Sequence, residues 1–262
     1  MTTKLTCAAI LAMGLSVAAG SAPALAEMCV GYGPQTPRDI TQTEGLNERI
    51  FALAESSTNM NLCNIHSHTQ AEHKGPGFGV RGGTGEFGGW KCNGTEDLTE
   101  AELAPMDGPY GNVVPGDTIE VHWVHTSCDV QPGPGLGSCL SDACANPTLR
   151  VEAQVFLVVN DPNALDFNDF AYSGNVQDGY HQAKSIPSDT GEPVVFAGST
   201  TGSSYTEAVC SPLQVTWSVR PQCARVHIGS LHEWAETNPF DEKKSHGVRQ
   251  IVTSPELLAP IN

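Results

Sequence analysis

The sequence predicts a mainly β protein: a single-domain antiparallel β-sandwich or jelly-roll-like fold, with a short N-terminal helix and long loops rich in glycine and proline. A composition of 39% hydrophobic and 16% charged residues is that of a chain that folds. The 27 glycines and 18 prolines separate short apolar runs of period two, as in strands joined by turns. Strands and helices do not alternate as in a parallel α/β sheet, so a sheet of that kind is not expected.

Residues 1–26 have the features of a secretory signal peptide. Lys4 precedes an apolar run, and the small-residue end at Ala24-Leu25-Ala26 is typical of a cleavage site after Ala26. The apolar run is shorter than the roughly 20 residues that a membrane-spanning helix needs, and no later stretch comes closer. We therefore expect a periplasmic or secreted protein without membrane insertion, in which residues 27–262 form one domain.

Charge and cysteine content narrow the choice of partners and compartment. The net charge of the whole chain is −16, and loss of the only charged residue of the signal peptide, Lys4, would make it −17. Such acidity argues against nucleic acid and anionic membrane surfaces as partners. The even number of cysteines in an exported domain predicts disulfides, and we expect the local pairs Cys210–Cys223 and Cys139–Cys144.

The N-terminal helix is predicted over residues 42–56. Thr41 and Glu44 have the spacing of a capping box, and the apolar residues after them fall on one helical face.

Five strands are predicted from runs of alternating apolar residues. They span Asp117 to His125, Arg150 to Val159, Val194 to Ala197, Leu213 to Val219 and Arg225 to Ile228. The second of these is apolar on both faces, so we expect it to lie at the centre of the sheet.

Two histidine clusters stand out on the predicted strands. In the first, His66 and His68 are two residues apart, so a strand projects both imidazoles from one face. In the second, Glu120 and His122 share a face, whereas His125 has the opposite parity. A regular strand can bring only one of these two histidines to a shared site, and we choose His122.

Three neutral imidazoles that leave one metal position open are typical of a catalytic zinc site. We therefore expect His66, His68 and His122 to bind Zn²⁺, with Co²⁺ or Cd²⁺ as substitutes. Cysteine ligation is less favoured, because the thiols should be oxidised after export. Glu120 is placed to accept the outer ring N–H of a ligand histidine and so to fix its orientation.

The chain resembles the delta-class carbonic anhydrases from about residue 60 to residue 250. The segments that carry the resemblance are Asn64-Ile-His66-Ser-His68, Ala71-Glu72-His73-Lys74, Glu120-Val-His122-Trp-Val-His125, Val151-Glu-Ala-Gln-Val-Phe156, Ser188-Asp-Thr-Gly191, Gly198-Ser-Thr-Thr-Gly202, Cys210-Ser-Pro212 and His246-Gly247. One departure is Ser67, where the diatom members of the class are expected to carry a bulky aromatic residue.

The resemblance implies a carbonate dehydratase, a lyase that hydrates CO2 reversibly to bicarbonate and a proton. In carbonic anhydrases zinc is known to lower the pKa of its bound water to about 7, which supplies hydroxide at neutral pH. The unrelated alpha-class enzymes also present His-x-His and Glu-x-His-x-x-His patterns, and this analogy supports the three proposed ligands.

The remaining site residues receive supporting roles. We expect Glu72 and Glu120 to lie outside the set of metal ligands, because a carboxylate ligand would partly neutralise the charge that favours ionisation of water. His73 and His125 are the candidates for a solvent-reachable imidazole that carries away the released proton.

Two other functions fit part of the pattern. The spacing of His66, His68, Glu72 and Gly79 fits the first motif of a cupin, which would suggest iron or manganese and oxygen chemistry with Glu72 as a ligand. The second cupin motif fails after Pro115-Gly116. A non-catalytic exported metal-binding protein is the third reading, but the chain has no flexible histidine-rich tract.

Overall fold

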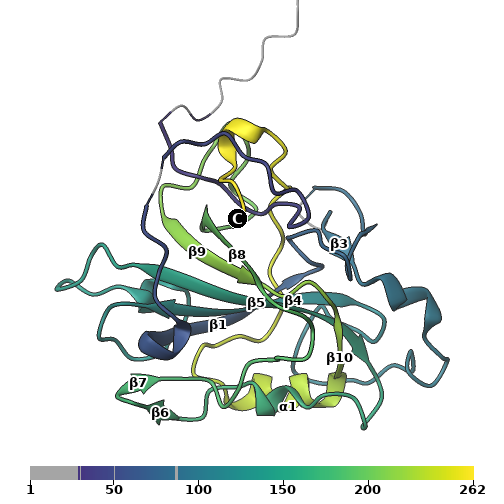
Figure 1. Ribbon diagram of the computed structural model, residues 1–262. Helices are drawn as coiled ribbons and strands as arrows, with labels where there is room; N and C mark the ends of the chain where they lie inside the picture. Colours follow the sequence, from purple (N-terminus) through teal and green to yellow (C-terminus); the bar gives the residue numbers. More distant parts are fainter. Residues whose placement is uncertain (1–28, 30, 50, 86–87) are drawn as a thin grey trace, which may run out of the picture.

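The computed structural model describes residues 29, 31–49, 51–85 and 88–262. Within them a six-stranded main sheet forms the centre of the protein, with the path β1-β4-β5-β9-β8 and β10 paired to β5 (Figure 1). Its strands are β1 (Asn61–Thr69), β4 (Thr118–Thr126), β5 (Leu149–Val159), β8 (Val194–Ser199), β9 (Gln214–Val219) and β10 (Ala224–His227). The predicted mainly β class is confirmed, and the five strands predicted from the sequence are present. The predicted signal peptide lies outside the described residues.

Strand β5 is central, as its two apolar faces predict. It pairs with β4 along one edge, antiparallel over nine residues. Its other edge is shared by two strands, since β9 pairs in parallel with the first half of β5 and β10 with the second half. These parallel pairs differ from the expected all-antiparallel sheet, although antiparallel pairs dominate elsewhere in it.

The smaller elements lie around the main sheet. Two short hairpins pair β2 (Val80–Arg81) with β3 (Trp90–Lys91) and β6 (Val176–Gln177) with β7 (Tyr180–His181). The described 3-10 helices are η1 (Ser57–Asn59), η3 (Asn93–Asp97), η4 (Leu136–Cys139), η5 (Phe167–Asp169) and η6 (Pro255–Leu257), and the α-helix is α1 (Ile228–Thr237). No helix among the described residues is long and apolar enough to span a membrane.

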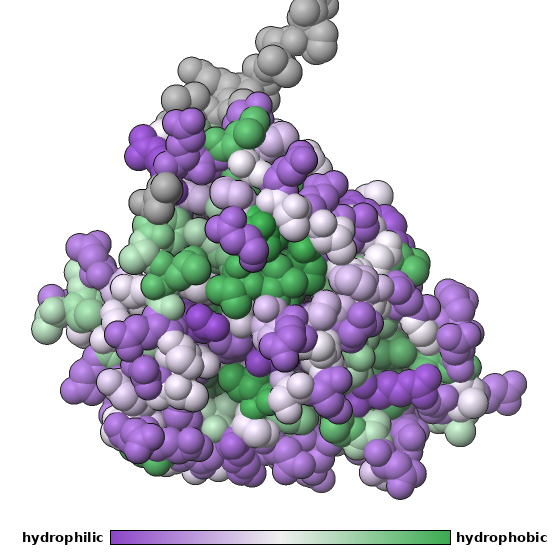
Figure 2. Space-filling model, in the orientation of Figure 1, coloured by the Kyte–Doolittle hydropathy of each residue, from purple (hydrophilic) through white to green (hydrophobic). Residues whose placement is uncertain are grey.

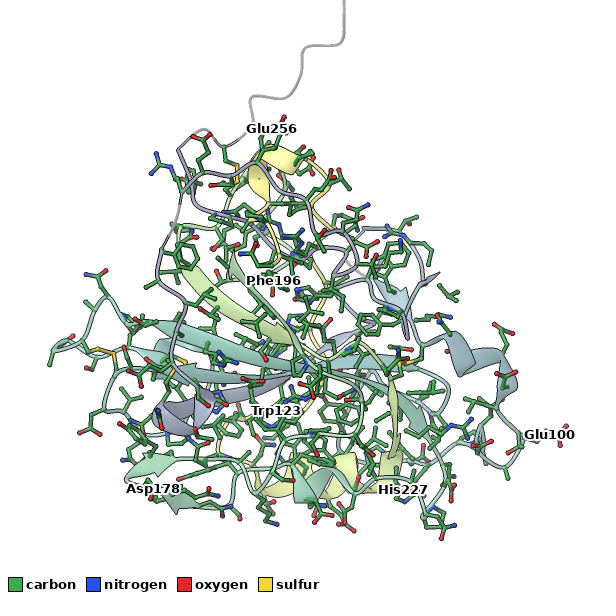
Figure 3. All side chains as sticks on the ribbon, in the orientation of Figure 1. Glu100, Trp123, Asp178, Phe196, His227 and Glu256 are labelled. Carbon is green, nitrogen blue, oxygen red and sulfur yellow. A yellow bond between two sulfur atoms is a disulfide. The ribbon has the colours of Figure 1, made fainter. Side chains whose placement is uncertain are left out.

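The two faces of the main sheet differ in chemistry. The helix face, on which Trp123, Phe156 and Val158 lie, packs against α1 and η5 in an apolar core. The histidine face carries His66, His68 and His122 beside a second core that includes Phe196 and Trp217. Figure 1 shows α1 and the β6–β7 hairpin on one side of β1, β4 and β5, with β8, β9 and the C-terminal segment on the other. Trp123 and Phe196 lie on opposite sides of these strands (Figure 3). This alternation follows from the period-two geometry of a strand.

The predicted helix over 42–56 is wrong. Apart from residue 50, which is not described, the segment has no helical residue and runs as an extended chain over the surface. Leu46 and Leu53, two residues of the predicted apolar face, are 64% and 52% exposed. A short helix is stable only when packing buries its apolar face. Here the main-chain N–H groups of Leu46 and Asn47 instead donate to the carbonyls of Pro255 and Leu258 in the C-terminal segment.

Both predicted disulfides are also wrong, although all eight cysteines outside residues 1–26 are paired. The observed pairs are Cys29–Cys210, Cys63–Cys139, Cys92–Cys223 and Cys128–Cys144. Three of them join segments more than 70 residues apart in sequence, which local spacing does not reveal.

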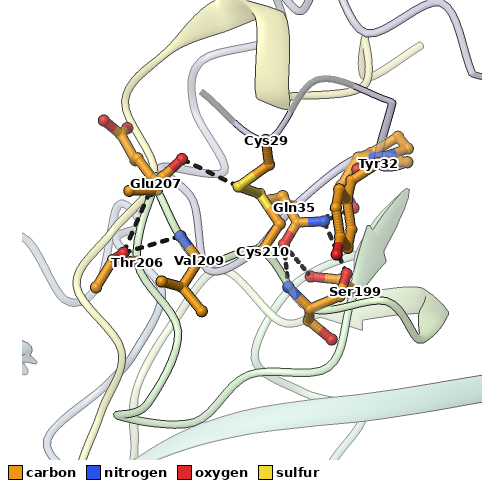
Figure 4. The surroundings of a disulfide bond; sticks show 12 residues. Cys29, Tyr32, Gln35, Ser199, Thr206, Glu207, Val209 and Cys210 are labelled. Carbon is orange, nitrogen blue, oxygen red and sulfur yellow. Dashed lines mark hydrogen bonds between the residues drawn. A yellow bond between two sulfur atoms is a disulfide. The ribbon is translucent and has the colours of Figure 1, made fainter. Parts of the chain in front are cut away.

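The Cys29–Cys210 disulfide fastens the N-terminal segment to the loop that follows β8 (Figure 4). Beside it the buried Gln35 side chain accepts hydrogen bonds from the Ser211 main-chain N–H at 2.9 Å and from Ser199 Oγ at 3.3 Å. A covalent bond and buried hydrogen bonds therefore hold the N-terminal segment, at Cys29 and Gln35, against this loop. Figure 2 shows apolar side chains gathered over β8 and β9 on this side of the protein.

Candidate metal centre

The register between β1 and β4 brings the predicted metal ligands together. His66 lies directly opposite His122, and His68 lies opposite Glu120. A β-bulge in β1 between Leu62 and Asn64 places Leu62 and Ile65 both in the core of the helix face. From Asn64 onward, every second residue of β1 therefore lies on the histidine face.

The three imidazoles form a compact cluster. Ring centroids are 5.1 Å apart for His66 and His68, 5.1 Å for His66 and His122, and 4.8 Å for His68 and His122. One nitrogen from each ring lies within 4.8 Å of the other two. The predicted trio is thus assembled from two strands that are about 50 residues apart in sequence.

Hydrogen bonds on the outer side of each ring determine which nitrogen is free. His66 Nδ1 donates to Asn64 Oδ1 at 2.6 Å, and His68 Nδ1 donates to the Gly247 carbonyl at 3.1 Å. The Asn64 assignment is fixed, because its Nδ2 donates to the Gly133 carbonyl. Each of these two rings therefore leaves an unprotonated Nε2.

The third ring is held the other way round. His122 Nε2 donates to Glu120 Oε1 at 3.1 Å, so His122 leaves its Nδ1 unprotonated, 3.3 Å from His66 Nε2. In these tautomers neither His122 Nδ1 nor His66 Nε2 carries a proton, so no hydrogen bond joins them. The buried His68 Nε2 also has no hydrogen-bond partner. Three converging lone pairs fit a soft or borderline metal ion, and tetrahedral zinc in particular.

Burial keeps the three imidazoles neutral, as metal ligation requires. It lowers the pKa of His68 from 6.5 to about 4 and that of His122 below 6.5. For His66, burial together with the neighbouring His68 and His122 lowers the pKa well below 6.5.

The two carboxyl groups beside the cluster differ in position and in the direction in which their pKa is shifted. Burial opposes the ionisation of Glu120, but the charges and hydrogen bonds of His73 and His122 outweigh it and lower its pKa well below 4.5. For Glu72, burial raises the pKa. Glu72 Oε1 lies 3.3 Å from His68 Nδ1, the ring nitrogen that does not face the cluster. Neither residue belongs to the trio itself, but Glu120 forms a second group of possible metal ligands with His73 and His122. In that group Glu120 lies on the Nε2 side of His122, whereas the trio uses Nδ1.

The two predicted proton carriers do not reach solvent. His73 and His125 are both 0% exposed. His73 Nδ1 bonds to Glu120 Oε1, and His125 Nδ1 donates to the Trp123 carbonyl. A proton carrier must reach solvent, and neither residue does. The His73 ring packs behind the Glu120 carboxylate, and the His125 ring points to the opposite face of β4 from the trio.

A cavity of about 520 Å³ opens above the trio. Apolar side chains of the main sheet, among them Val151 and Trp217, form one wall. The hydroxyl side chains of 200–204, the loop 134–136 and the segment 240–247 also line the cavity. His246, to which the sequence analysis gave no role, lies in this segment, and its side chain is 49% exposed. A hydrogen bond to Glu242 raises its pKa.

Several contributors to the site were not found from the sequence. Asn64 is two residues before His66, so the strand period could have revealed it. Gly247 and Trp217 come from distant segments, and no local pattern connects them with the histidines.

Comparison with known proteins gave one family match. A search of curated proteins found no match. Among solved structures, the alpha-carbonic anhydrase of Photobacterium profundum matches with 15% sequence identity and a TM-score of 0.32, over 83% of this chain and 87% of that chain. A likeness at this level does not establish a shared fold. The family model described as delta carbonic anhydrase matches residues 57–230, a range that contains the three clustered histidines and both carboxylates. This match covers most of the chain, and the protein therefore belongs to the delta carbonic anhydrase family.

Proposed function

We propose that this protein is a zinc-dependent carbonate dehydratase that converts CO2 and water reversibly into bicarbonate and a proton. The observation that carries the proposal is the convergence of His66 Nε2, His68 Nε2 and His122 Nδ1, three unprotonated nitrogens on one buried sheet face. These atoms would hold the metal. When bound, zinc acts as a Lewis acid that, in carbonic anhydrases, lowers the pKa of a coordinated water to about 7.

The outer hydrogen bonds prepare the three rings for this role. Asn64 Oδ1, the Gly247 carbonyl and Glu120 Oε1 each accept one ring N–H, which fixes the tautomer and the direction of the opposite nitrogen. We assign Glu120 this orienting role, and we place Glu72 beside it as a carboxyl outside the ligand set. Three neutral ligands leave the full positive charge of the ion to act on water.

The cavity supports CO2 as the substrate. CO2 is small, uncharged and weakly hydrated, so the apolar wall formed by residues such as Val151 and Trp217 offers it a suitable approach to the trio. The same wall excludes water from one side of the site. The hydroxyl-lined side, at residues 200–204, offers hydrogen bonds to the charged product.

The proposal extends to processing and location. We propose that residues 1–26 are removed after Ala26 and that residues 27–262 act as one catalytic domain in the periplasm or outside the cell. The four disulfides fit an oxidising compartment of this kind. CO2 and bicarbonate would be its small-molecule partners.

Metal content and CO2 hydration by purified residues 27–262 test the proposal. We expect about one zinc per chain, loss of hydration after extraction with a chelator, and recovery on addition of zinc; cobalt or cadmium should also occupy the site. Undiminished hydration without metal would contradict the proposal. Iron or manganese with no hydration would instead indicate a cupin-type oxygenase, and tightly bound zinc with no turnover would indicate a non-catalytic metal-binding protein.

A further inference from the structure

The buried carboxylate of Glu120 is hydrogen-bonded from two directions. Its Oε1 accepts from His122 Nε2 at 3.1 Å and from His73 Nδ1 at 2.7 Å. Its Oε2 accepts from the main-chain N–H groups of Glu72 at 2.7 Å and His73 at 3.1 Å. Two of these four bonds come from His73, so this residue is the main partner that holds Glu120 from the side away from the metal trio.

The His73 ring is itself fixed by aromatic packing. Its centroid lies 4.7 Å from that of Trp217 and 6.0 Å from that of Phe196. Trp217 also contacts the His122 ring, at 4.9 Å, and its Nε1 donates to the Ser199 carbonyl at 2.9 Å. The rings of His73 and His122 are therefore both held by Trp217 and both bonded to the same carboxylate oxygen.

The two ring nitrogens of His73 differ in their partners. Nδ1 bonds to Glu120, whereas Nε2 is buried and has no hydrogen-bond partner. A residue that served only to fill this space would be better apolar, because an unpartnered buried polar atom destabilises the fold. The retained imidazole therefore points to the Nδ1 bond as the reason for a histidine here.

We propose that His73 is a positioning residue for the metal centre: it holds Glu120 where Oε1 receives the N–H of His122, and so keeps His122 in the tautomer that presents Nδ1 to the metal. This inference rests on the proposed zinc function and deepens it. The contacts run from His73 through Glu120 to His122. His73 itself neither lines the cavity nor belongs to the three proposed ligands.

Zinc affinity provides a readout that is independent of catalysis. Zinc would be removed from purified residues 27–262, and the dissociation constant measured by competition with a chromophoric chelator. The two test variants are His73→Asn, whose amide N–H can occupy the place of Nδ1–H, and His73→Gln, whose amide extends toward the place of Nε2. His125→Gln is the matched control, because His125 is equally buried but bonds to the Trp123 carbonyl, away from the trio.

We expect His73→Gln to weaken zinc binding about 10-fold, the lower end of the range for loss of a direct partner of a ligand, because His73 acts through Glu120 and main-chain bonds to Glu120 remain. His73→Asn should stay within about 3-fold of the parent chain, and so should His125→Gln. Equal affinity of the Asn and Gln variants, whether both are strong or both are weak, would overturn the inference. If the parent chain binds zinc but does not hydrate CO2, the proposed function fails, and the affinities still decide the role of His73.

Discussion

His122 and His125 lie three residues apart on the same strand, yet they belong to different environments. His122 joins His66 and His68 beneath an open cavity, whereas His125 is enclosed on the other side of β4 with its Nδ1 bonded to the Trp123 carbonyl. The difference is one of parity, because successive strand residues project to opposite faces. The motif Glu-x-His-x-x-His therefore contributes one member of the trio, and the pairing with β1 places the other two beside it.

The same contrast holds for the two faces of the main sheet as a whole. The helix face buries large apolar side chains against α1, so its residues act mainly on stability. The histidine face gathers imidazoles and carboxylates whose arrangement suits metal binding. Substitutions on the two faces should accordingly change different measured quantities.

The largest effect is expected from loss of a ligand. His68→Ala or His122→Ala should remove bound zinc and abolish CO2 hydration, because two imidazoles cannot hold the ion in an open catalytic site. His125→Ala, on the other face, should retain about one zinc per chain. Metal analysis and stopped-flow hydration measure both quantities. Retention of zinc and activity by His122→Ala would show that β4 supplies a different ligand.

A large apolar residue of the helix face should affect folding instead. Phe156 is fully buried in the core against Phe167 and Phe170, so Phe156→Ala should lower the free energy of unfolding by about 3–5 kcal/mol. The zinc affinity of the molecules that remain folded should be unchanged. Denaturant unfolding with intact disulfides, combined with a zinc titration, checks both statements. If Phe156→Ala kept the parental stability but bound zinc weakly, the helix face would act on metal binding rather than on stability, which would contradict the proposal.

The carboxylate of the histidine face should give an intermediate effect. Glu120→Ala removes the acceptor of the His122 N–H and should reduce zinc affinity or hydration about 10-fold to 100-fold without abolishing either. Glu152→Ala is the comparison, since Glu152 pairs with Arg150 and Arg220 and has no contact with the trio. If both variants lose zinc affinity equally, the effect of Glu120 does not depend on its bond to His122.

The smallest effect concerns the pH dependence of stability. Burial lowers the pKa of His125 to about 4; the nearby Glu152 opposes this shift, and Arg150 adds to it. In the unfolded chain the pKa is about 6.5, so unfolding takes up a proton between these values and stability falls as the pH decreases. Between pH 7 and pH 5.5 this group should contribute a loss of about 1 kcal/mol.

The variant His125→Leu should therefore lose less stability than the parent chain over this pH range. Unfolding curves at both pH values, with saturating zinc in each sample, give the difference. An identical decline in the two proteins would mean that His125 is not the group that titrates.

The sequence predicted the strands and the three clustered histidines because both depend on a local period of two. It did not predict what depends on distant chain segments. Cys63 pairs with Cys139, and Cys144 with Cys128, according to how loops return to the sheet. The helix expected over 42–56 failed for the same reason, since local capping and periodicity do not show that the main chain of this segment bonds to the C-terminal segment.

In the candidate site, too, the features that follow from a local pattern were predicted and those that depend on distant segments were not. The parity of β4 correctly separated His122 from His125. The burial of His73, the Gly247 carbonyl that accepts from His68 and the packing of Trp217 against His122 arise from tertiary packing, which no motif encodes.

X-ray absorption spectroscopy of the metal in purified residues 27–262 tests the central claim most directly. The account predicts a single zinc with three imidazole nitrogens and one further light atom at about 2.0–2.1 Å, and no sulfur ligand. In the His122→Ala variant this three-imidazole signature should disappear, and in His125→Ala it should persist. A shell dominated by carboxylate oxygen or containing sulfur, or an unchanged spectrum in His122→Ala, would contradict it.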